Sequence, residues 1–136
     1  MARWGKVDFK ALKRMQKKME RLEKDYETFV VSVTKEIAGR LLREVKNNTN
    51  VITGYLRNNW TVDVNVKKIG DQYVIEVYNN TEYASYYEYG HRTPNHQGWV
   101  NGRFTMTLAA DYIESQTPNI IRRRLTRMLK EAFDGN

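Results

Sequence analysis

Apolar residues recur at helical spacing through the first third of the chain. From residue 7 to residue 47 they step by three and four, as in a heptad seam, and then by four. The seam consists of Leu12, Met15, Met19, Leu22, Tyr26, Phe29, Val33, Ile37, Leu41 and Val45. It predicts one helix over residues 7–47, capped by Asp8 and about 61 Å long at 1.5 Å per residue. A globule of 136 residues has a radius of gyration of only about 14 Å, so such a helix either breaks near residues 25–28 or projects beyond its domain. Because neither Gly nor Pro precedes Gly39, we favour projection or a mild bend.

Two segments of alternating apolar and polar residues follow. They cover residues 60–67 and 73–78, and the tight turn Gly70-Asp71 lies between them. In the register set by this turn, the apolar residues share one face. The expected cross-strand pairs are Val66 with Ile75, Val64 with Val77, and Asn65 with Glu76. We therefore predict a β-hairpin that packs one face on the helices and acts as scaffold.

The stretch 81–104 has the most unusual composition. It holds four tyrosines within seven residues, then Gly90, then turn-forming residues over 93–102 around Trp99. We expect a short Tyr-rich helix followed by a long loop, and loops of this length usually have a functional reason. Tyr and Trp combine apolar area with a polar tip, which suits a surface buried against a partner, although Trp99 could instead fold back over the hairpin. The predicted interface residues are Tyr83, Tyr86, Tyr87, Glu88, Tyr89, Gly90, His91, Arg92, Trp99 and Arg103.

Two helical patterns complete the chain. The first, over residues 103–115, has Met106, Ala109, Ala110 and Ile113 on one side. Thr117 and Pro118 are typical of a second helix start, because Thr caps well and Pro is accepted in the first turn. The expected buried stripe of this helix is Ile121, Leu125, Met128, Ala132 and Phe133. The order predicts a single α+β domain over residues 1–136: a long N-terminal helix, a small antiparallel sheet built on a β-hairpin, a short Tyr-rich helix, a long loop and two C-terminal helices.

The net charge of +7 is concentrated at the two ends of the chain. Residues 1–24 carry nine Lys/Arg against three Asp/Glu, residues 25–116 nine against eleven, and residues 117–136 five against two. On the long helix the basic residues lie opposite the seam, and they are Lys10, Lys13, Arg14, Lys17, Lys18, Arg21 and Lys24. A solvated helix face is the commonest reason for such a pattern, and nucleic acid or an acidic protein partner are the alternatives.

Candidate chemistry is sparse. The chain has no cysteine, and two histidines alone are too few for a metal site. Ser85, Glu88 and His91 match no catalytic arrangement, and a salt bridge or a helix-end histidine is the simpler interpretation. Gly98 and Gly102 lack the Lys-Ser/Thr of a phosphate loop and are interpreted as a hinge. We therefore expect no enzymatic activity, no metal and no cofactor. No apolar run reaches the roughly 20 residues of a membrane span and the start lacks a signal peptide, so we expect a soluble, cytoplasmic chain without membrane contact.

Two motifs carry a resemblance to a known family. The first is Thr53-Gly54-Tyr55-Leu56-Arg57-Asn58, ahead of the strand pair. The second reads V-Y-N-N-T-E-Y-A over 77–84 and continues with Tyr87-Glu88-Tyr89-Gly90. With a basic N-terminal helix before them and a variable loop after them, the whole chain resembles the tail-completion (head–tail joining, neck or minor tail) proteins of long-tailed bacteriophages and prophages. It departs from the pattern at Asn50-Val51, where many relatives have Ala-Pro.

The resemblance implies a non-enzymatic structural protein of the virion neck, assembled in the host cytoplasm as a homo-oligomeric ring, with a hexamer as the expectation. The implied partners are the connector or stopper and the tail-tube or tail-terminator proteins, with non-specific DNA contact as an option. Thr53, Gly54, Leu56 and Arg57 form its structural motif. Subunits of a ring meet through two different patches.

We place the predicted interface residues on one patch and part of the N-terminal helix on the other. Arg57 and Arg103 are expected to pair with Glu82 or Glu88, within or between subunits. The alternative function is sequence-independent nucleic-acid binding through the basic ends. The aromatic residues concentrate in the acidic middle, which argues against a base-stacking groove.

Overall fold

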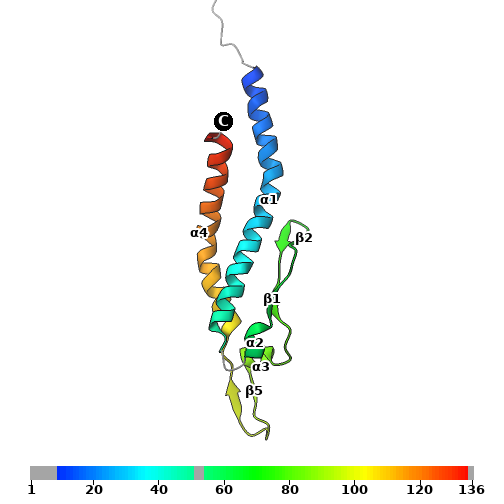
Figure 1. The fold of residues 1–136 in the computed structure, drawn as a ribbon, viewed down its shortest axis with the longest axis vertical. Helices are drawn as coiled ribbons and strands as arrows, with labels where there is room; N and C mark the ends of the chain where they lie inside the picture. The colour runs from blue at the N-terminus through cyan, green and yellow to red at the C-terminus, as the bar shows by residue number, and fades with distance from the viewer. Residues whose placement is uncertain (1–8, 51–53, 135–136) are drawn as a thin grey trace, which may run out of the picture.

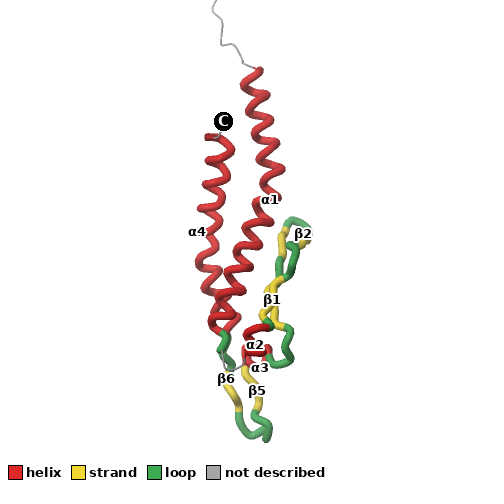
Figure 2. Tube along the Cα trace, viewed as in Figure 1, coloured by secondary structure: helices red, strands yellow, loops and turns green. Residues whose placement is uncertain are grey.

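The structure is a computed structural model that describes residues 9–50 and 54–134. Its class is α+β, as predicted: two long antiparallel helices lie side by side, and short strands and helices lie beside and beyond one end of the pair (Figures 1 and 2). The elements are α1 Phe9–Asn48, α2 Gly54–Asn58, β1 Trp60–Val62, β2 Lys67–Ile69, β3 Gln72–Val74, β4 Val77–Asn79, α3 Ala84–Tyr89, β5 Gly90–Arg92, β6 Trp99–Asn101 and α4 Thr105–Asp134. The order of layers is α4, α1, and then the strands β1 to β4 (Figure 1).

The first helix is unbroken, as its apolar seam predicts. α1 contains 40 residues, which corresponds to about 60 Å. The expected start at residue 7 and the cap Asp8 lie outside the described residues. The C-terminal part of the seam is buried, with Val33 at 6% and Val45 at 0% exposure, whereas Met15 and Tyr26 are each 56% exposed. The seam therefore changes from core to surface along a single helix.

The two helices expected at the C-terminus are one helix. α4 continues without a break through Pro118. A proline inside a helix removes one backbone hydrogen bond and costs about 3 kcal/mol. The Thr117 hydroxyl donates to the Ile113 carbonyl at 2.8 Å, and Ile113 and Ile120, on either side of Pro118, are buried. Burying a side chain of this size stabilises by about 1.5–3 kcal/mol, so packing outweighs the local penalty.

The continuous helix also moves the buried stripe by one residue. Ile120 is 3% exposed, whereas Ile121 and Phe133 of the expected stripe are 38% and 48% exposed. The other expected members, Leu125, Met128 and Ala132, are half-buried. The helical phase set by Ile113 continues through Pro118, and it brings residue 120 rather than 121 towards α1. The sequence prediction was wrong here because it started a new helix at Pro118.

The β-hairpin has the predicted turn but two separate ladders. β2 pairs with β3, with Ile69 opposite Gln72, so the turn at Gly70-Asp71 is confirmed. β1 pairs with β4 in a register shifted by two residues, with Val62 opposite Val77. The expected pairs of Val64 with Val77 and Asn65 with Glu76 are therefore wrong.

A bulge separates the two ladders. Residues 63–66 stand opposite residues 75–76, and Val64 is 86% exposed. The Asp63 amide donates to the Glu76 carbonyl at 2.9 Å, and the Asp63 carboxylate accepts the Glu76 N–H at 3.0 Å. A shift of two residues keeps every side chain on the same face, so alternation along the sequence contains no sign of the bulge.

The hydrophobic core lies where α1 and α4 meet the ladder of β1 and β4. Val45 and Ala109 are fully buried and Trp60 is 8% exposed, with Leu41, Leu42, Val77 and Met106 packed around them. The Trp60 indole N–H donates to the Thr49 hydroxyl at 2.8 Å, and that hydroxyl donates to the Val45 carbonyl at 2.7 Å. The buried polar atoms are thus paired, as stable burial requires. This core fixes one end of the helix pair and leaves the Tyr-rich segment outside it.

Candidate interaction surface

The segment expected to be a long loop forms a second β-hairpin. The Tyr-rich helix is present as α3, and β5 then pairs antiparallel with β6, with His91 opposite Val100 and Arg92 opposite Trp99. The connecting turn covers residues 93–98 and is closed by the Thr93 amide, which donates to the Gly98 carbonyl at 3.0 Å. The prediction of a loop over 93–102 was therefore too long. In Figure 1 this hairpin extends beyond the ends of the two long helices.

Two glycines allow the chain to cross itself where this hairpin leaves the domain. At Gly90, which has φ 92°, an added Cβ would lie 2.5 Å from the Val100 carbonyl oxygen, and at Gly102 it would overlap the Glu88 carbonyl oxygen. The Phe104 amide donates to that same Glu88 carbonyl at 3.1 Å. Gly102 is thus a point of backbone contact, where the absence of a side chain is required.

Glu88 connects α3 to the first turn of α4. Its side chain is 7% exposed, and its carboxylate accepts the N–H groups of Met106 at 2.8 Å and Thr107 at 3.0 Å. The hydroxyls of Thr107 and Thr105 donate to it at 2.7 Å and 3.2 Å. A carboxylate at a helix N-terminus satisfies free N–H groups and opposes the positive end of the helix dipole.

These contacts also set the acidity of Glu88. Burial raises the pKa of the Glu88 carboxyl, but the hydrogen bonds from Met106, Thr107 and Thr105 outweigh burial and hold the pKa below its ordinary value of 4.5. Glu88 was grouped with the interface from its place between two tyrosines. The structure instead gives it a role inside the fold. The pattern Thr105-x-Thr107 at a helix start is the sequence signal for its partners.

Two other predicted interface residues are partly inside the fold. The Tyr87 hydroxyl accepts the Asn50 N–H at 3.0 Å and so ties α3 to the end of α1. The His91 ring lies 5.6 Å from the Tyr86 ring, centroid to centroid. The His91 Nδ1 atom is buried without a hydrogen-bond partner among the described residues.

The remaining aromatic side chains of this region face solvent. Tyr83, Tyr86, Tyr89 and Trp99 are 59%, 55%, 65% and 58% exposed, and we call these four residues the aromatic end. The alternative in which Trp99 covers the first hairpin is therefore wrong for the isolated chain. Arg92 and Arg103 are exposed beside the aromatic end. Phe104, which sequence inspection missed, packs edge-on against Tyr89 at 6.2 Å between ring centroids.

The residues of the first family motif are mostly structural. Thr53 lies outside the described residues, and Gly54 begins α2. Leu56 is buried at 4% exposure, and its carbonyl accepts the Asn79 side-chain amide at 2.8 Å. Arg57 is half-buried. Among the described residues the ion pairs are Arg40–Glu36, Lys68–Glu27 and Arg124–Glu36, so the expected pairs of Arg57 or Arg103 with Glu82 or Glu88 do not form within the chain.

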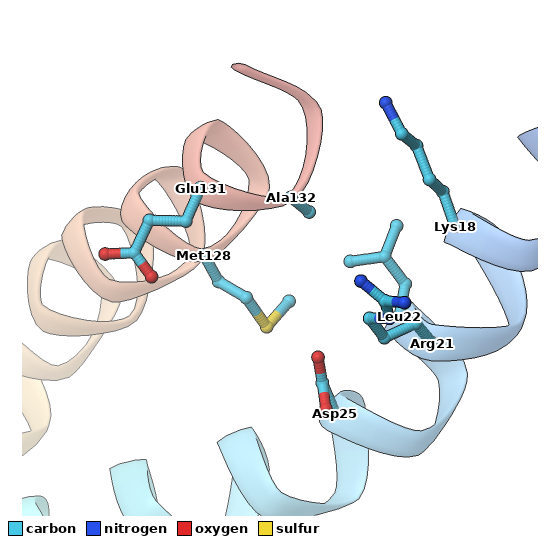
Figure 3. A pocket seen from close by; sticks show the side chains of 7 residues that line it. All are labelled: Lys18, Arg21, Leu22, Asp25, Met128, Glu131 and Ala132. Carbon is cyan, nitrogen blue, oxygen red and sulfur yellow. The ribbon is translucent and has the colours of Figure 1, made fainter. Parts of the chain in front are cut away.

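The opposite end of the helix pair opens into a cavity. Arg124 of α4 donates hydrogen bonds to Glu36 at 2.8 Å and to Ser32 at 2.6 Å, and so connects the two helices on the core side of this end. Beyond it lies a cavity of about 340 Å³ lined by Lys18, Arg21, Leu22, Asp25, Met128, Glu131 and Ala132. Figure 3 shows Leu22 and Met128 reaching towards each other across the space. We call this region the open end.

The family model described as "Bacteriophage HK97-gp10, putative tail-component" matches residues 13–90. The chain belongs to this family. The match covers α1 from residue 13, the first hairpin and α3 through Gly90. It includes both motifs that carried the resemblance, and the resemblance is confirmed to that extent. Neither a curated protein nor a solved structure matches the chain. As a member of the HK97-gp10-like family, the chain is a bacteriophage tail component.

The described residues contain no group of three or more His, Cys, Asp or Glu side chains that could hold a metal ion. Within the same residues, no helix is both long and apolar enough to cross a membrane.

Proposed function

We propose that the chain completes the phage tail by joining it to the head, as a ring of copies in the virion neck. The observation that carries the proposal is the aromatic end. It places Tyr83, Tyr86, Tyr89 and Trp99 in solvent on a segment that Glu88 holds firmly against α4. Exposed aromatic side chains on a preorganised support are typical of binding anchors, because little ordering entropy is lost on contact.

The total surface of the chain supports contacts with more than one neighbour. Its accessible area is 11097 Å², whereas a monomeric protein of 16.1 kDa exposes about 7,400 Å². The chain therefore exposes more area than a compact globule of the same mass. A standard interface buries about 800 Å² per partner. The two-helix shape therefore leaves room for contacts of this size with neighbouring proteins.

The second contact surface in this proposal is the apolar side of the helix pair. Leu12, Met15, Met19 and Tyr26 of α1 are exposed, as are Ile121 and Leu129 of α4. Because α1 carries a heptad seam through this region, the surface fits another helix, and we assign it to a neighbouring copy. The aromatic end then provides the other, different patch through which a ring subunit meets its next neighbour.

The decisive test is Trp99→Ala in the phage. We expect the free energy of unfolding of the isolated chain to stay within about 0.5 kcal/mol, as for other exposed sites. We expect filled heads and finished tails that do not join, because truncating a loop anchor costs about 2 kcal/mol or more of binding. Electron microscopy of lysates and a thermal melt provide the two measurements. Tyr78→Ala is the control, since Tyr78 is an exposed aromatic residue of β4 that does not belong to the aromatic end.

Normal virions from the Trp99→Ala phage would contradict the joining role of this surface. A large loss of melting temperature would instead show that Trp99 stabilises the fold, and Tyr89→Ala would then replace it in the same assay. The alternative function, nucleic-acid binding as the main activity, rests on the basic ends of the chain and concerns a different surface.

A further inference from the structure

The two basic ends of the sequence lie on the same side of the open end. α1 and α4 run antiparallel, so the N-terminal half of α1 lies beside the C-terminal half of α4, as the shared cavity lining confirms. Both segments expose basic side chains. We define the basic face as Lys13, Arg14, Lys17, Arg21 and Lys24 of α1 with Arg123, Arg127 and Lys130 of α4, all of which are exposed.

Helix geometry places these eight residues on one side. Successive residues of an α-helix are about 100° apart, so the five residues of α1 fall within an arc of about 100°, nearly opposite the apolar seam. On α4, the direction towards α1 is given by Ile120, Arg124 and Met128. The basic residues of α4 lie on one side of this direction, and Ile121, Leu125 and Leu129 lie on the other.

The antiparallel arrangement then decides which sides coincide. We view each helix along its own chain direction and start from the positions that face the other helix. Seen this way, the basic arc lies on the same rotational side in both helices. Because the two helices run in opposite directions, both basic arcs fall on one side of the plane through the two axes, and both apolar arcs fall on the other. The open end is therefore a two-helix layer with one basic and one apolar side.

Members of the basic face form no ion pair with acidic side chains of the described chain. The ion pairs there involve Arg40, Lys68 and Arg124, and none involves a member of the basic face. Several members are three or four residues apart on the same helix, such as Lys13 with Lys17 and Arg123 with Arg127. Like charges at this spacing destabilise a helix by about 0.2–0.5 kcal/mol per pair. A bound polyanion would remove this repulsion.

We propose that the basic face binds the phosphate backbone of double-stranded DNA without sequence preference. The basic residues of α1 extend over about 17 Å of helix, a length over which a duplex carries about ten phosphates. Single-strand binding would need aromatic platforms beside the charges. The aromatic end lies at the other end of the molecule (Figure 1), and the exposed Tyr26 belongs to the apolar side. This inference concerns a different surface from the aromatic end and does not depend on head–tail joining.

The test is fluorescence anisotropy of a labelled duplex of 20 base pairs with the purified chain, at several salt concentrations. If about five phosphates are contacted, log Kd changes with log salt with a slope near 4.5, and affinity falls about 500-fold between 50 and 200 mM salt. Lys13→Gln/Lys17→Gln/Arg21→Gln should lower that slope by about 2.7, and Arg123→Gln/Arg127→Gln by about 1.8. Gln has a helix propensity close to those of Lys and Arg, so circular dichroism should remain unchanged.

The matched control removes three charges outside the basic face. Lys67→Gln/Arg92→Gln/Arg103→Gln changes exposed residues and should leave the slope unchanged. An equal loss of slope in this control would overturn the proposal, because net charge alone would then explain binding. If the α1 variant lowers the slope and the α4 variant does not, the two helices do not form one binding face. If polyglutamate displaces the labelled duplex as readily as unlabelled duplex does, the face is assigned to acidic proteins instead. If no binding is measured at 50 mM salt, the face is a solvated helix surface.

Discussion

The aromatic end and the open end expose apolar side chains for different reasons. At the aromatic end, polar contacts within the chain fix the support, since Glu88 and Tyr87 bind backbone N–H groups of other segments. At the open end, two helices separate around a cavity of about 340 Å³, and α1 exposes the continuation of its own core seam. The support of the aromatic end is fully formed in the isolated chain. At the open end, the apolar residues of the seam lack a packing partner.

Exposure alone therefore does not define an interface type. Anchors held by a finished fold gain binding energy with little reorganisation. When an exposed apolar seam is buried by a partner, the association also stabilises the fold of the subunit, as in oligomers whose subunits are only marginally stable alone. Substitutions at the aromatic support should therefore change the stability of the isolated chain, whereas substitutions at the open end should change association.

The largest effect is expected at the backbone crossing beside the aromatic end. Gly102→Ala places a Cβ against the Glu88 carbonyl and the Tyr89 backbone, and we expect the free energy of unfolding to fall by about 3 kcal/mol or more. Gly39→Ala is the control, because no atom lies within 4 Å of its added Cβ. Within a helix that change should stabilise by about 0.5–1 kcal/mol. Urea unfolding of the two variants measures both, and equal stabilities would show that the crossing is not rigid.

The second effect concerns Glu88 and pH. Glu88→Gln keeps the shape of the side chain but loses charge-assisted hydrogen bonds, so we expect a loss of about 2 kcal/mol of unfolding free energy at pH 7. The pKa of Glu88 is lowered on folding, so its contribution is present above the ordinary carboxyl pKa and is lost as pH falls through the folded value. The difference between wild type and Glu88→Gln should therefore shrink below about pH 4.

Exposed Glu82 provides the comparison for this pH series. Glu82→Gln should stay within about 0.5 kcal/mol of wild type at every pH. A Glu88→Gln difference that persists undiminished at pH 2 would contradict a charged Glu88 as the cap of α4.

The third effect is expected at the open end and is the smallest per residue. Met19→Ser removes exposed apolar area from the seam, and we expect it to weaken self-association by about 1.5 kcal/mol, or roughly tenfold. The thermal midpoint at low protein concentration should stay the same. Sedimentation over a concentration series measures association, with Val64→Ser as control because Val64 is exposed on the bulge. A strictly monomeric wild type at high concentration would contradict the assignment of this surface to another copy.

Local sequence patterns were sufficient to predict much of the fold. The seam predicted an unbroken α1, the Gly70-Asp71 turn predicted the hairpin tip, and the tyrosines predicted α3. Errors arose where distant contacts override local signals. Pro118 continues a helix because Ile113 and Ile120 are buried on either side of it. The strand β6 consists of three residues between turn formers, and its pairing with β5 decides its conformation.

The residues of the candidate site were predictable from the sequence, but which of them are exposed and which stabilise the fold was not. Tyr83, Tyr86, Tyr89 and Trp99 are exposed, as a contact surface requires. Glu88 is buried because it caps the first turn of α4, and its partners at residues 105–107 follow it by 17–19 residues. No local pattern around Glu88 distinguishes a cap from an interfacial charge. The convergence of the two basic ends likewise depends on the antiparallel packing of α1 and α4.

The strands of this chain are unusually short, which affects how copies can stick to one another. The described residues form three separate two-stranded sheets, and every strand contains three residues. A free strand edge recruits a strand of another chain in proportion to the row of unpaired backbone groups it presents, and short or lysine-bearing edges resist this. The bulge after Val62 limits the longest hairpin to two such pieces, and Lys67 and Lys68 lie on the outer one. Closely packed copies of this chain should therefore avoid amyloid-like cross-pairing, which leaves recognition between them to side chains.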